Sequence, residues 1–238
     1  MKVSSFVASL SLGIGIRLAS AGIVAAGTPG PVFDPHNFSG HPIDNVWFPL
    51  TPGTRLIYKG DDQGARGTDE FHITQRTRTI LGVSCVVIDD SVIDNGLLVE
   101  HTLDFYAQDD DGNVWYMGEK TAEYDSSGHV VSREGSWQAG VNGARAGVFM
   151  PADPHVGDSY EQEFYAGHAE DHFTITNMDA SVSTPYGDFN HAMRTKEWTP
   201  LEPGIRDAKF YVRGIGEVLE KTVVGPTETF KLVQIITN

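Results

Sequence analysis

The sequence predicts an all-β fold: an antiparallel meander that forms a barrel or half-barrel, lipocalin-like in style, from two related halves. Segments rich in Val, Ile, Thr and aromatic residues follow one another, and Gly, Asp and Asn turns separate them. No segment of helical length has apolar residues at positions i, i+3, i+4 and i+7. A long meander must close or cover its edge strands, which favours a barrel over the alternative, a β-sandwich without a cavity.

Strands are expected in order along the first half of the chain. Their ranges are 54–60, 69–77, 82–93, 97–108, 112–119 and 121–125. Residues 22–52 precede them. This segment is rich in Pro, Gly, His and Asn and lacks periodicity, so it predicts an extended lead-in over the surface. A Gly-rich segment, 133–155, joins the two halves of a single β domain expected over 53–238.

The second half of the chain is expected to repeat the first. Several landmarks recur at a nearly constant offset of 102 to 105 residues, although each match alone is weak. The matched pairs are Gly53 with Gly157, Phe71 with Phe173, Gly82 with Gly187, Phe105-Tyr106 with Phe210-Tyr211, and Val114 with Val218. We therefore expect two pseudo-repeats, at about 50–125 and 155–238.

The first residues have the layout of a secretory signal peptide. Lys2 precedes an apolar stretch, and small residues offer a cleavage site after Ala21, with a second site after Ala26. Arg17 interrupts the stretch, which makes it short for the alternative, a membrane anchor of about 20 apolar residues. We expect a signal peptide over residues 1–21, no membrane span, and a protein that is secreted or located in the periplasm or cell envelope.

The formal net charge of −15 disfavours two classes of partner. Loss of residues 1–21 would take the charge to −17, because that segment contains Lys2 and Arg17 and no acidic residue. Such a charge repels phosphate backbones and anionic lipid headgroups, so neither nucleic acid nor a membrane is an expected partner. The expected partner is a small-molecule or carbohydrate ligand.

One predicted hairpin, LDFYAQDDDGNVWYMGE, carries a polar and aromatic face. Asp104 and Tyr106 alternate with apolar residues, while Glu119 and Tyr116 are expected on opposite faces of the return strand. Aromatic planes with a few polar groups are typical of a ligand pocket. The alternative is a solvated strand face, because such residues are also tolerated there. The predicted ligand-binding residues are Asp104, Tyr106, Gln108, Trp115 and Trp137.

The stretch AGHAEDHF, residues 166–173, raises the question of a metal site. On a strand, His168, Glu170 and His172 would point to one side, and two imidazoles with a carboxylate are suitable ligands for zinc. A third or fourth ligand would have to come from elsewhere. The alternative is a solvated strand face, since this face continues into threonines. The cofactor is therefore left open, with a divalent metal as one option.

The chain lacks the local signatures of several enzyme classes: Gly-x-Ser-x-Gly, His-Glu-x-x-His, a P-loop and Cys-x-x-Cys. Two carboxyl groups acting as general acid and base remain an option, because glycoside cleavage needs only two acids at a suitable separation. The candidate catalytic residues are Glu119, Glu163, Glu170 and Asp171.

Four phrases carry a resemblance to a known family: PIDNVWFPLTPGTRLIYKG, LDFYAQDDDGNVWYMGE, EGSWQAGVNGARAGVFMPADPHVGDSYEQEF and AEDHF. They resemble a family of uncharacterised bacterial all-β proteins that are secreted or lipid-anchored, over nearly all of the mature chain. The resemblance implies an extracytoplasmic location and no established activity. The resemblance also implies that several residues of this chain match the family pattern: Asp104, Tyr106, Gln108, Trp115, Glu119, Trp137, Glu163, Glu170 and Asp171. It implies that other residues also occur in the family at the positions of His168 and His172. The resemblance therefore disfavours a histidine metal site and favours the carboxylates as functional groups.

Two functions follow from these patterns. The first is an exported soluble protein that binds a small polar organic or sugar-like ligand in an aromatic and carboxylate-lined β pocket. The second is an extracellular hydrolase or lyase that uses carboxyl groups as acid and base, with or without a metal. A structural envelope module with a filled barrel is a third interpretation. A pocket carboxyl group with a raised pKa would favour the enzyme.

Overall fold

The computed structural model describes residues 30–62 and 65–237, and the fold is all-β, as predicted. Apart from one turn of 3-10 helix, η1 (Pro35–Asn37), the described elements are strands. No helical segment in this part of the chain has the length and hydropathy of a membrane span. The predicted signal peptide over residues 1–21, with either cleavage site, lies outside the described residues.

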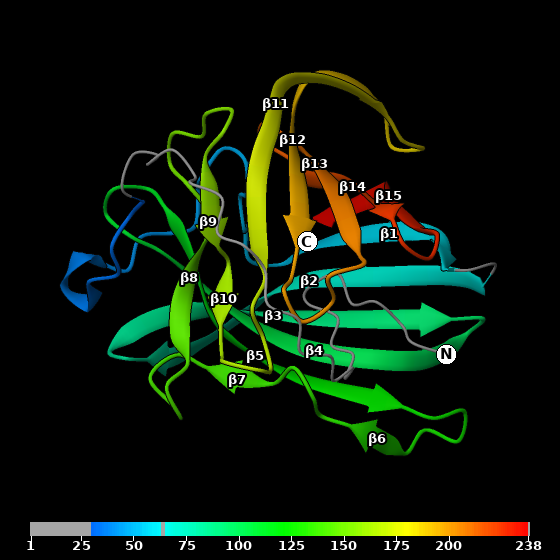
Figure 1. Ribbon diagram of the computed structural model, residues 1–238, viewed down its shortest axis with the longest axis horizontal. Coiled ribbons are helices and arrows are strands. Elements are labelled where there is room, and N and C mark those ends of the chain that lie inside the picture. The colour runs from blue at the N-terminus through cyan, green and yellow to red at the C-terminus, as the bar shows by residue number, and fades with distance from the viewer. Residues whose placement is uncertain (1–29, 63–64, 238) are drawn as a thin grey trace.

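Two meanders of long strands account for most of the described chain (Figure 1). The first comprises β1 (Thr54–Asp62), β2 (Ala65–Ile80), β3 (Val83–Asp94), β4 (Leu97–Gln108) and β5 (Val114–Tyr124). The second comprises β11 (His172–Ser183), β12 (Asp188–Trp198), β13 (Arg206–Val212), β14 (Gly216–Val224) and β15 (Glu228–Thr237). Short strands lie between them: β6 (Val130–Ser132), β7 (Trp137–Gln138), β8 (Arg145–Met150), β9 (Ser159–Glu161) and β10 (Glu163–Phe164).

The sheet curls until its two ends meet. Its strands follow the order β10-β8-β5-β4-β3-β2-β1-β15-β14-β13-β12-β11-β9, and β6 and β7 pair with β5. The end strands β9 and β10 are consecutive in the chain, with Gln162 alone between them. Gln162 also donates its backbone N–H to the carbonyl of Asp171 at 2.7 Å. The result is a nearly closed antiparallel barrel (Figure 1), which confirms the predicted fold class and protects the strand edges.

The landmarks of the predicted repeat occupy matching places in the two meanders. Gly53 and Gly157 both have positive φ, 91° and 99°, and each donates its N–H to an isoleucine carbonyl, of Ile73 in β2 and of Ile175 in β11. The β4–β5 ladder shifts register at Phe105-Tyr106, and the β13–β14 ladder shifts at Phe210-Tyr211. These correspondences agree with two related halves, while a duplication as such stays a prediction.

The lead-in reaches the core, which differs from the surface path expected for it. Ile43, Trp47, Phe48 and Leu50 are buried in the same hydrophobic cluster as the barrel strands. The ring of Phe48 packs against Phe149 of β8, with centroids 4.5 Å apart. Apolar residues spaced irregularly among Pro and Asn give no period, so a periodicity analysis does not detect this burial.

Gly147 of β8 is expected to be essential for barrel closure. A Cβ there would lie 2.2 Å from the backbone carbonyl of Gln162, and backbone cannot move aside as a flexible side chain can. Gly147→Ala should therefore lower the free energy of unfolding by about 1–3 kcal/mol, measured by urea denaturation. Gly204→Ala is the control, because a Cβ there meets no atom within 4 Å. Equal stability of the two variants would contradict the close approach.

Candidate functional site

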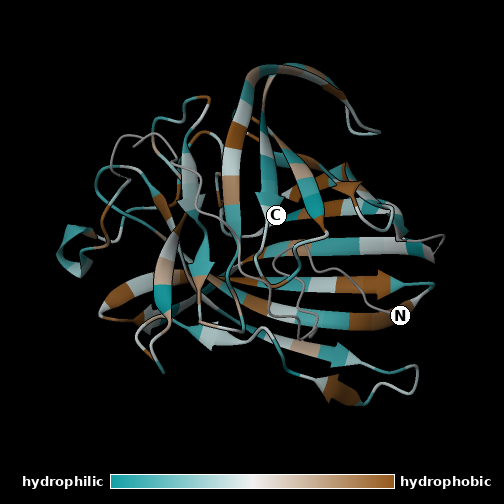
Figure 2. Cartoon of the chain, viewed as in Figure 1, coloured by the Kyte–Doolittle hydropathy of each residue, from teal (hydrophilic) through white to brown (hydrophobic). Residues whose placement is uncertain are grey.

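The barrel interior holds acidic side chains, although burial of an unpaired charge is costly. Hydrophilic and hydrophobic residues alternate along the long strands (Figure 2), and several of the hydrophilic ones are buried. The buried acids include Asp69, Asp90, Glu100, Asp104, Glu119, Glu163, Glu197 and Glu217. Among the described residues, Lys209 of β13 is the only buried lysine or arginine. Carboxyl groups therefore far outnumber the buried cations.

Asp104 and Glu119 share the hydroxyl group of Tyr116. The Tyr116 oxygen lies 2.7 Å from Asp104 Oδ1 and 2.8 Å from Glu119 Oε2. A phenol has one hydrogen, so Tyr116 can be the donor in only one of these contacts. The other contact requires a proton on Asp104 or Glu119, with the tyrosine oxygen as acceptor. At least one of the two carboxyl groups is therefore neutral in this arrangement.

A β-bulge brings these three side chains together. The β4–β5 ladder shifts by one residue at Phe105-Tyr106, so one residue of β5 is extra. Gly118 makes the bulge feasible: its φ is +139°, and a Cβ there would lie 2.6 Å from the carbonyl oxygen of Trp137. The prediction that Tyr116 and Glu119 occupy opposite faces is wrong, because the extra residue reverses the alternation between them.

Glu163 of β10 adds a third carboxyl group beside the first two. The indole N–H of Trp137 donates to Glu163 Oε2 at 2.6 Å, and the Trp137 ring meets the Tyr116 ring edge-on with centroids 5.4 Å apart. Trp137 also faces Glu119 across the β5–β7 ladder. Asp104, Glu119 and Glu163 are referred to below as the carboxyl cluster. One oxygen of each has no hydrogen-bond partner.

Burial raises the pKa of each member of the carboxyl cluster well above the usual range of a carboxyl group. Neighbouring carboxyl groups raise these pKa values further. The largest such effect on Glu119 comes from Glu163, and the largest on Glu163 comes from Asp171. Lys209 lowers the pKa of Glu163 by less than burial raises it. These surroundings therefore favour the protonated form of the cluster's carboxyl groups.

A pocket of about 270 Å³ opens onto Glu119 and Trp137. Its volume lies close to the lower end of the roughly 300–1,000 Å³ typical of small-molecule sites. The aromatic lining residues are Phe105, Trp137 and Tyr165, and the polar ones include Glu119, Gln138 and Asn142. The pocket thus joins the carboxyl cluster to a wall of aromatic planes.

Tyr106 is a further polar group beside the cluster. Its ring stacks on Tyr116 with centroids 4.7 Å apart and an interplanar angle of 16°. The side chain is fully buried, and its hydroxyl group has no hydrogen-bond partner. After burial, the charge of Asp104 is the largest influence that raises the Tyr106 pKa, which places the two groups close together. Tyr106, Asp104 and Trp137 are therefore the predicted ligand-binding residues that the structure gathers.

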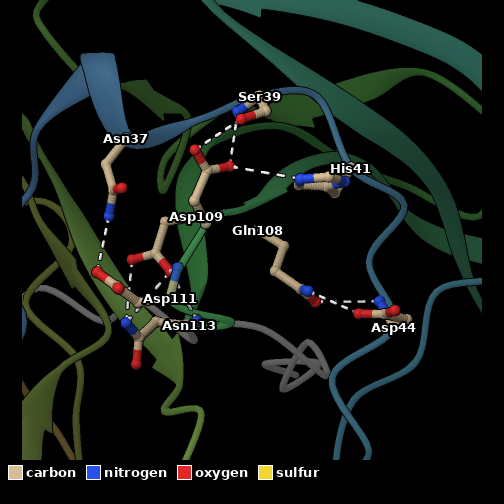
Figure 3. Close-up of polar contacts among 9 residues, drawn as sticks. Asn37, Ser39, His41, Asp44, Gln108, Asp109, Asp111 and Asn113 are labelled. Atoms are coloured by element: carbon tan, nitrogen blue, oxygen red, sulfur yellow. Dashed lines mark hydrogen bonds and ion pairs between the residues drawn. The ribbon is translucent and has the colours of Figure 1, made fainter.

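The other two predicted ligand-binding residues serve different contacts. Gln108 Oε1 accepts the backbone N–H groups of Asp44 and Asn45, and its amide nitrogen donates to Asp44 Oδ1 at 2.7 Å (Figure 3). The indole N–H of Trp115 donates to Asp109 Oδ2 at 2.8 Å, within the β4–β5 turn. Gln108 therefore anchors the lead-in, and Trp115 stabilises the turn.

AGHAEDHF does not form one continuous strand. His168 lies in a turn, where its Nδ1 is 2.7 Å from Glu134 Oε1, and Glu170 accepts a backbone N–H of the same turn. His172 begins β11 and stacks on Trp198 with centroids 4.4 Å apart. The three predicted metal ligands are not brought together. In residues 30–62 and 65–237, no group of three or more His, Cys, Asp or Glu side chains is arranged to hold a metal ion.

Three of the four candidate catalytic residues lie near one another. Glu119 and Glu163 belong to the carboxyl cluster, and Asp171 is the neighbour with the largest effect on the Glu163 pKa. Burial raises the pKa of Asp171 to about 7. Glu170, by contrast, is held in the turn that contains His168.

Sequence analysis missed a second acidic pair, Asp69 of β2 and Asp90 of β3. The two carboxyl groups influence each other, since Asp69 is the largest cause of the raised pKa of Asp90 after burial, and neither oxygen of Asp69 has a hydrogen-bond partner. Burial raises the pKa of Asp69 to about 8 and that of Asp90 well above its usual range. The alternation of side chains along a strand could have indicated this burial. Asp69 is two residues from Phe71 and four from Ile73, so it points to the same face as these buried residues.

A matched pair of tyrosine variants tests the hydrogen bonding of the cluster. Tyr116→Phe should lower the free energy of unfolding by about 1–3 kcal/mol, because it removes the partner that Asp104 and Glu119 share. Tyr106→Phe should be neutral or stabilising, because it removes a buried hydroxyl group that has no partner. Urea denaturation at pH 7 gives both values. An equal loss in the two variants would show that the shared hydroxyl has no special role.

Stability should fall as pH rises through the neutral range. The folded-state pKa of Asp69, about 8, exceeds its ordinary value of 3.8, so the folded protein binds this proton more tightly than the unfolded chain. The stabilisation is complete below about pH 4 and is lost progressively as pH approaches about 8.

Asp69→Asn tests this dependence. The variant should reduce the fall in unfolding free energy between about pH 5 and pH 8 by at least about 1 kcal/mol, measured by urea denaturation. Asp110→Asn is the control, because hydrogen bonds from Ser39 lower the pKa of that exposed carboxyl group. A slope that is unchanged in Asp69→Asn would count against a protonated pair.

Comparison with known proteins gives structural neighbours only. No protein-family model matches the chain, and no curated protein matches it. A protein from Bacteroides fragilis NCTC 9343, described as exported with a YmcC-like fold, aligns with a TM-score of 0.47 and 15% identity over 81% of this chain and 100% of that chain. A protein from Parabacteroides distasonis ATCC 8503, described as a lipoprotein, aligns with a TM-score of 0.43 and 12% identity over 81% and 99%. Both TM-scores are below 0.5, so the site has to be interpreted from its own geometry.

Proposed function

We propose that this protein binds a small polar organic or sugar-like molecule in the pocket that opens onto Glu119 and Trp137. One observation carries the proposal: a buried carboxyl group with an unpartnered oxygen and an indole ring line the same cavity of about 270 Å³. Ligand pockets typically combine aromatic walls with a few polar groups that set the orientation of the ligand.

The pocket walls are held in place before a ligand arrives. Trp137 is fixed by its hydrogen bond to Glu163. Arg78 donates to Gln138 and lies over the Phe105 ring at 4.6 Å from its centroid, so these three lining residues position one another. Pre-organised walls reduce the entropy that binding would otherwise cost. This rigidity supports a binding site for one class of small ligand.

A second function, general acid–base catalysis in the same pocket, is favoured by the protonation of Glu119. Burial and the neighbouring Glu163 raise its pKa, and a general acid must keep its proton near the working pH. Glu119 would then be the acid, with Glu163 as its neighbouring carboxyl group. Hydrolysis or elimination of a sugar-like substrate is the corresponding reaction class.

The proposal includes export from the cytoplasm. The support is the signal-peptide layout of residues 1–21, with its apolar stretch and small residues at the cleavage site. The family resemblance of the sequence implies the same location.

Binding can be measured by thermal unfolding of the mature protein with a panel of monosaccharides, polyols and amino alcohols, followed by calorimetric titration. A ligand should raise Tm, and Tyr165→Ala should weaken its binding about tenfold, because the variant removes an aromatic wall. Tyr186→Ala is the matched control, because Tyr186 is exposed and outside the pocket lining. Binding that is equal in the two variants, or absent throughout the panel, would refute the proposal.

Glu119→Gln separates the two functions with the same ligands. A variant that still binds but no longer turns over a wild-type substrate would assign Glu119 as the acid of an enzyme. Weaker binding in the variant, with no turnover by the wild type, would assign a binding protein.

A further inference from the structure

The two halves of the barrel differ in charge at one matched place. In the first half, Asp104 of β4 faces Glu119 of β5. In the second half, Lys209 of β13 faces Glu220 of β14. Both positions immediately precede the Phe-Tyr pair at which the respective ladder shifts register. Asp104 therefore stands where the other half of the barrel has a lysine.

The second half holds an ammonium group among its glutamates at the matched place. Lys209 Nζ lies 3.4 Å from Glu197 Oε2, 3.7 Å from Glu220 Oε1 and 3.9 Å from Glu217 Oε2. Burial alone would lower the pKa of Lys209, but the surrounding carboxylates raise it well above its usual value. The three glutamates therefore favour the charged ammonium group inside the barrel, although burial also raises their own pKa values, to about 8 for Glu217.

The carboxyl cluster has three buried carboxyl groups and, in the part of the chain that the structure describes, no buried ammonium group paired with them. Within the described residues, no lysine, arginine or histidine forms an ion pair with a member of the carboxyl cluster. The buried oxygens without a hydrogen-bond partner include Asp104 Oδ2, Glu119 Oε1, Glu163 Oε1 and the Tyr106 hydroxyl oxygen, besides oxygens of Asp69, Asp90, Asp94 and Glu217 elsewhere in the barrel. Such atoms are rare in folded proteins and are typical of sites completed by a ligand or ion.

The pocket gives a ligand access to this incomplete site. Glu119 and Trp137 line it, and Trp137 is bonded to Glu163. Two cationic side chains, Arg78 and Lys120, also line the pocket. Arg78 donates to Gln138, and neither cation forms an ion pair with Glu119. The oxygen of Glu119 without a hydrogen-bond partner is therefore open to a cation that enters the pocket.

We infer that the pocket takes a ligand with a protonated primary amine, and that this amine binds at Glu119 within the carboxyl cluster, as Lys209 binds its three glutamates. The inference rests on the proposed function and specifies its ligand class. An ammonium group donates three hydrogen bonds and carries a charge, so it satisfies several carboxyl oxygens at once. A hydroxyl group in the same place donates one hydrogen bond and carries no charge.

Binding of the amine should release a proton. In the free protein, at least one of Asp104 and Glu119 is neutral, as the shared Tyr116 hydroxyl requires. When an ammonium group arrives, the carboxyl group ionises, its proton passes to solvent, and a carboxylate–ammonium pair remains. Up to one proton per bound amine is therefore expected.

The test uses matched probes in which a hydroxyl group replaces each amine: glucosamine against glucose, and 1,4-diaminobutane against 1,4-butanediol. Calorimetric titration of the mature protein at pH 6.5 gives Kd for each, and two buffers with different ionisation heats give the protons released. The amine should bind at least tenfold more tightly than its hydroxyl counterpart, with proton release. Glucose or butanediol binding as tightly as its amine would overturn the inference and leave the polar pocket intact.

Asp104→Lys converts the first half to the charge pattern of the second. The variant should gain thermal stability and lose the amine preference, because its own ammonium group would occupy the cluster. Glu134→Gln is the control, since Glu134 is exposed and pairs with His168; it should keep the preference. If Asp104→Lys does not fold, Asp104→Asn should still reduce the preference severalfold. A preference that persists in a folded Asp104 variant would place the amine elsewhere and overturn the inference.

The remaining outcomes separate this inference from the proposed function. Binding of neutral panel members by the wild type, with no binding of either amine probe, would overturn the inference alone. No binding of any probe or panel member would overturn the inference and the proposed function together.

Discussion

A buried carboxyl group requires a proton, a cation or a hydrogen-bond donor, and this requirement governs the interior of the barrel. The structure meets it in three ways. Lys209 neutralises glutamates of the second half. Burial raises the pKa of Asp69 and Asp90, which favours their protonated forms. Tyr116 and Trp137 donate to the carboxyl cluster but leave an oxygen of each member without a partner. In this third case a pocket of about 270 Å³ adjoins the acids.

The carboxyl cluster also depends on how the barrel closes. Glu163 belongs to β10, at one end of the sheet, and Asp171 precedes β11, next to the other end. They come together because Gln162 alone separates β9 from β10 and bonds to the backbone of Asp171. The candidate site therefore lies at the seam of the barrel. A change that opened the seam would separate Glu163 from Glu119 even if every strand remained intact.

The fold was predictable from the sequence to a greater extent than the site. Strand positions follow from β-rich segments and turn residues, and both signals are local. The site depends on three features that are not local. The bulge at Gly118 places Tyr116 and Glu119 on one face, and one glycine among many gives no sign of it. The turn around His168 interrupts a stretch whose alternation favours a strand. Glu119, Glu163 and Trp137 were identified as candidates, but their proximity depends on barrel closure, which no spacing in the chain reveals.

The contrast between the two halves bears on why the cluster is incomplete. Both halves use the same register shift and a carboxyl group at the position that faces Asp104 or Lys209. A lysine there would neutralise Glu119 and remove the cost of burying unpartnered acids. The first half instead keeps Asp104, together with the unpartnered hydroxyl group of Tyr106. Local energetic costs of this kind persist in natural proteins mainly at functional sites, where the rest of the fold offsets them. The second half of the barrel thus pairs its buried glutamates with its own lysine, and in the proposed function a ligand takes the corresponding place in the first.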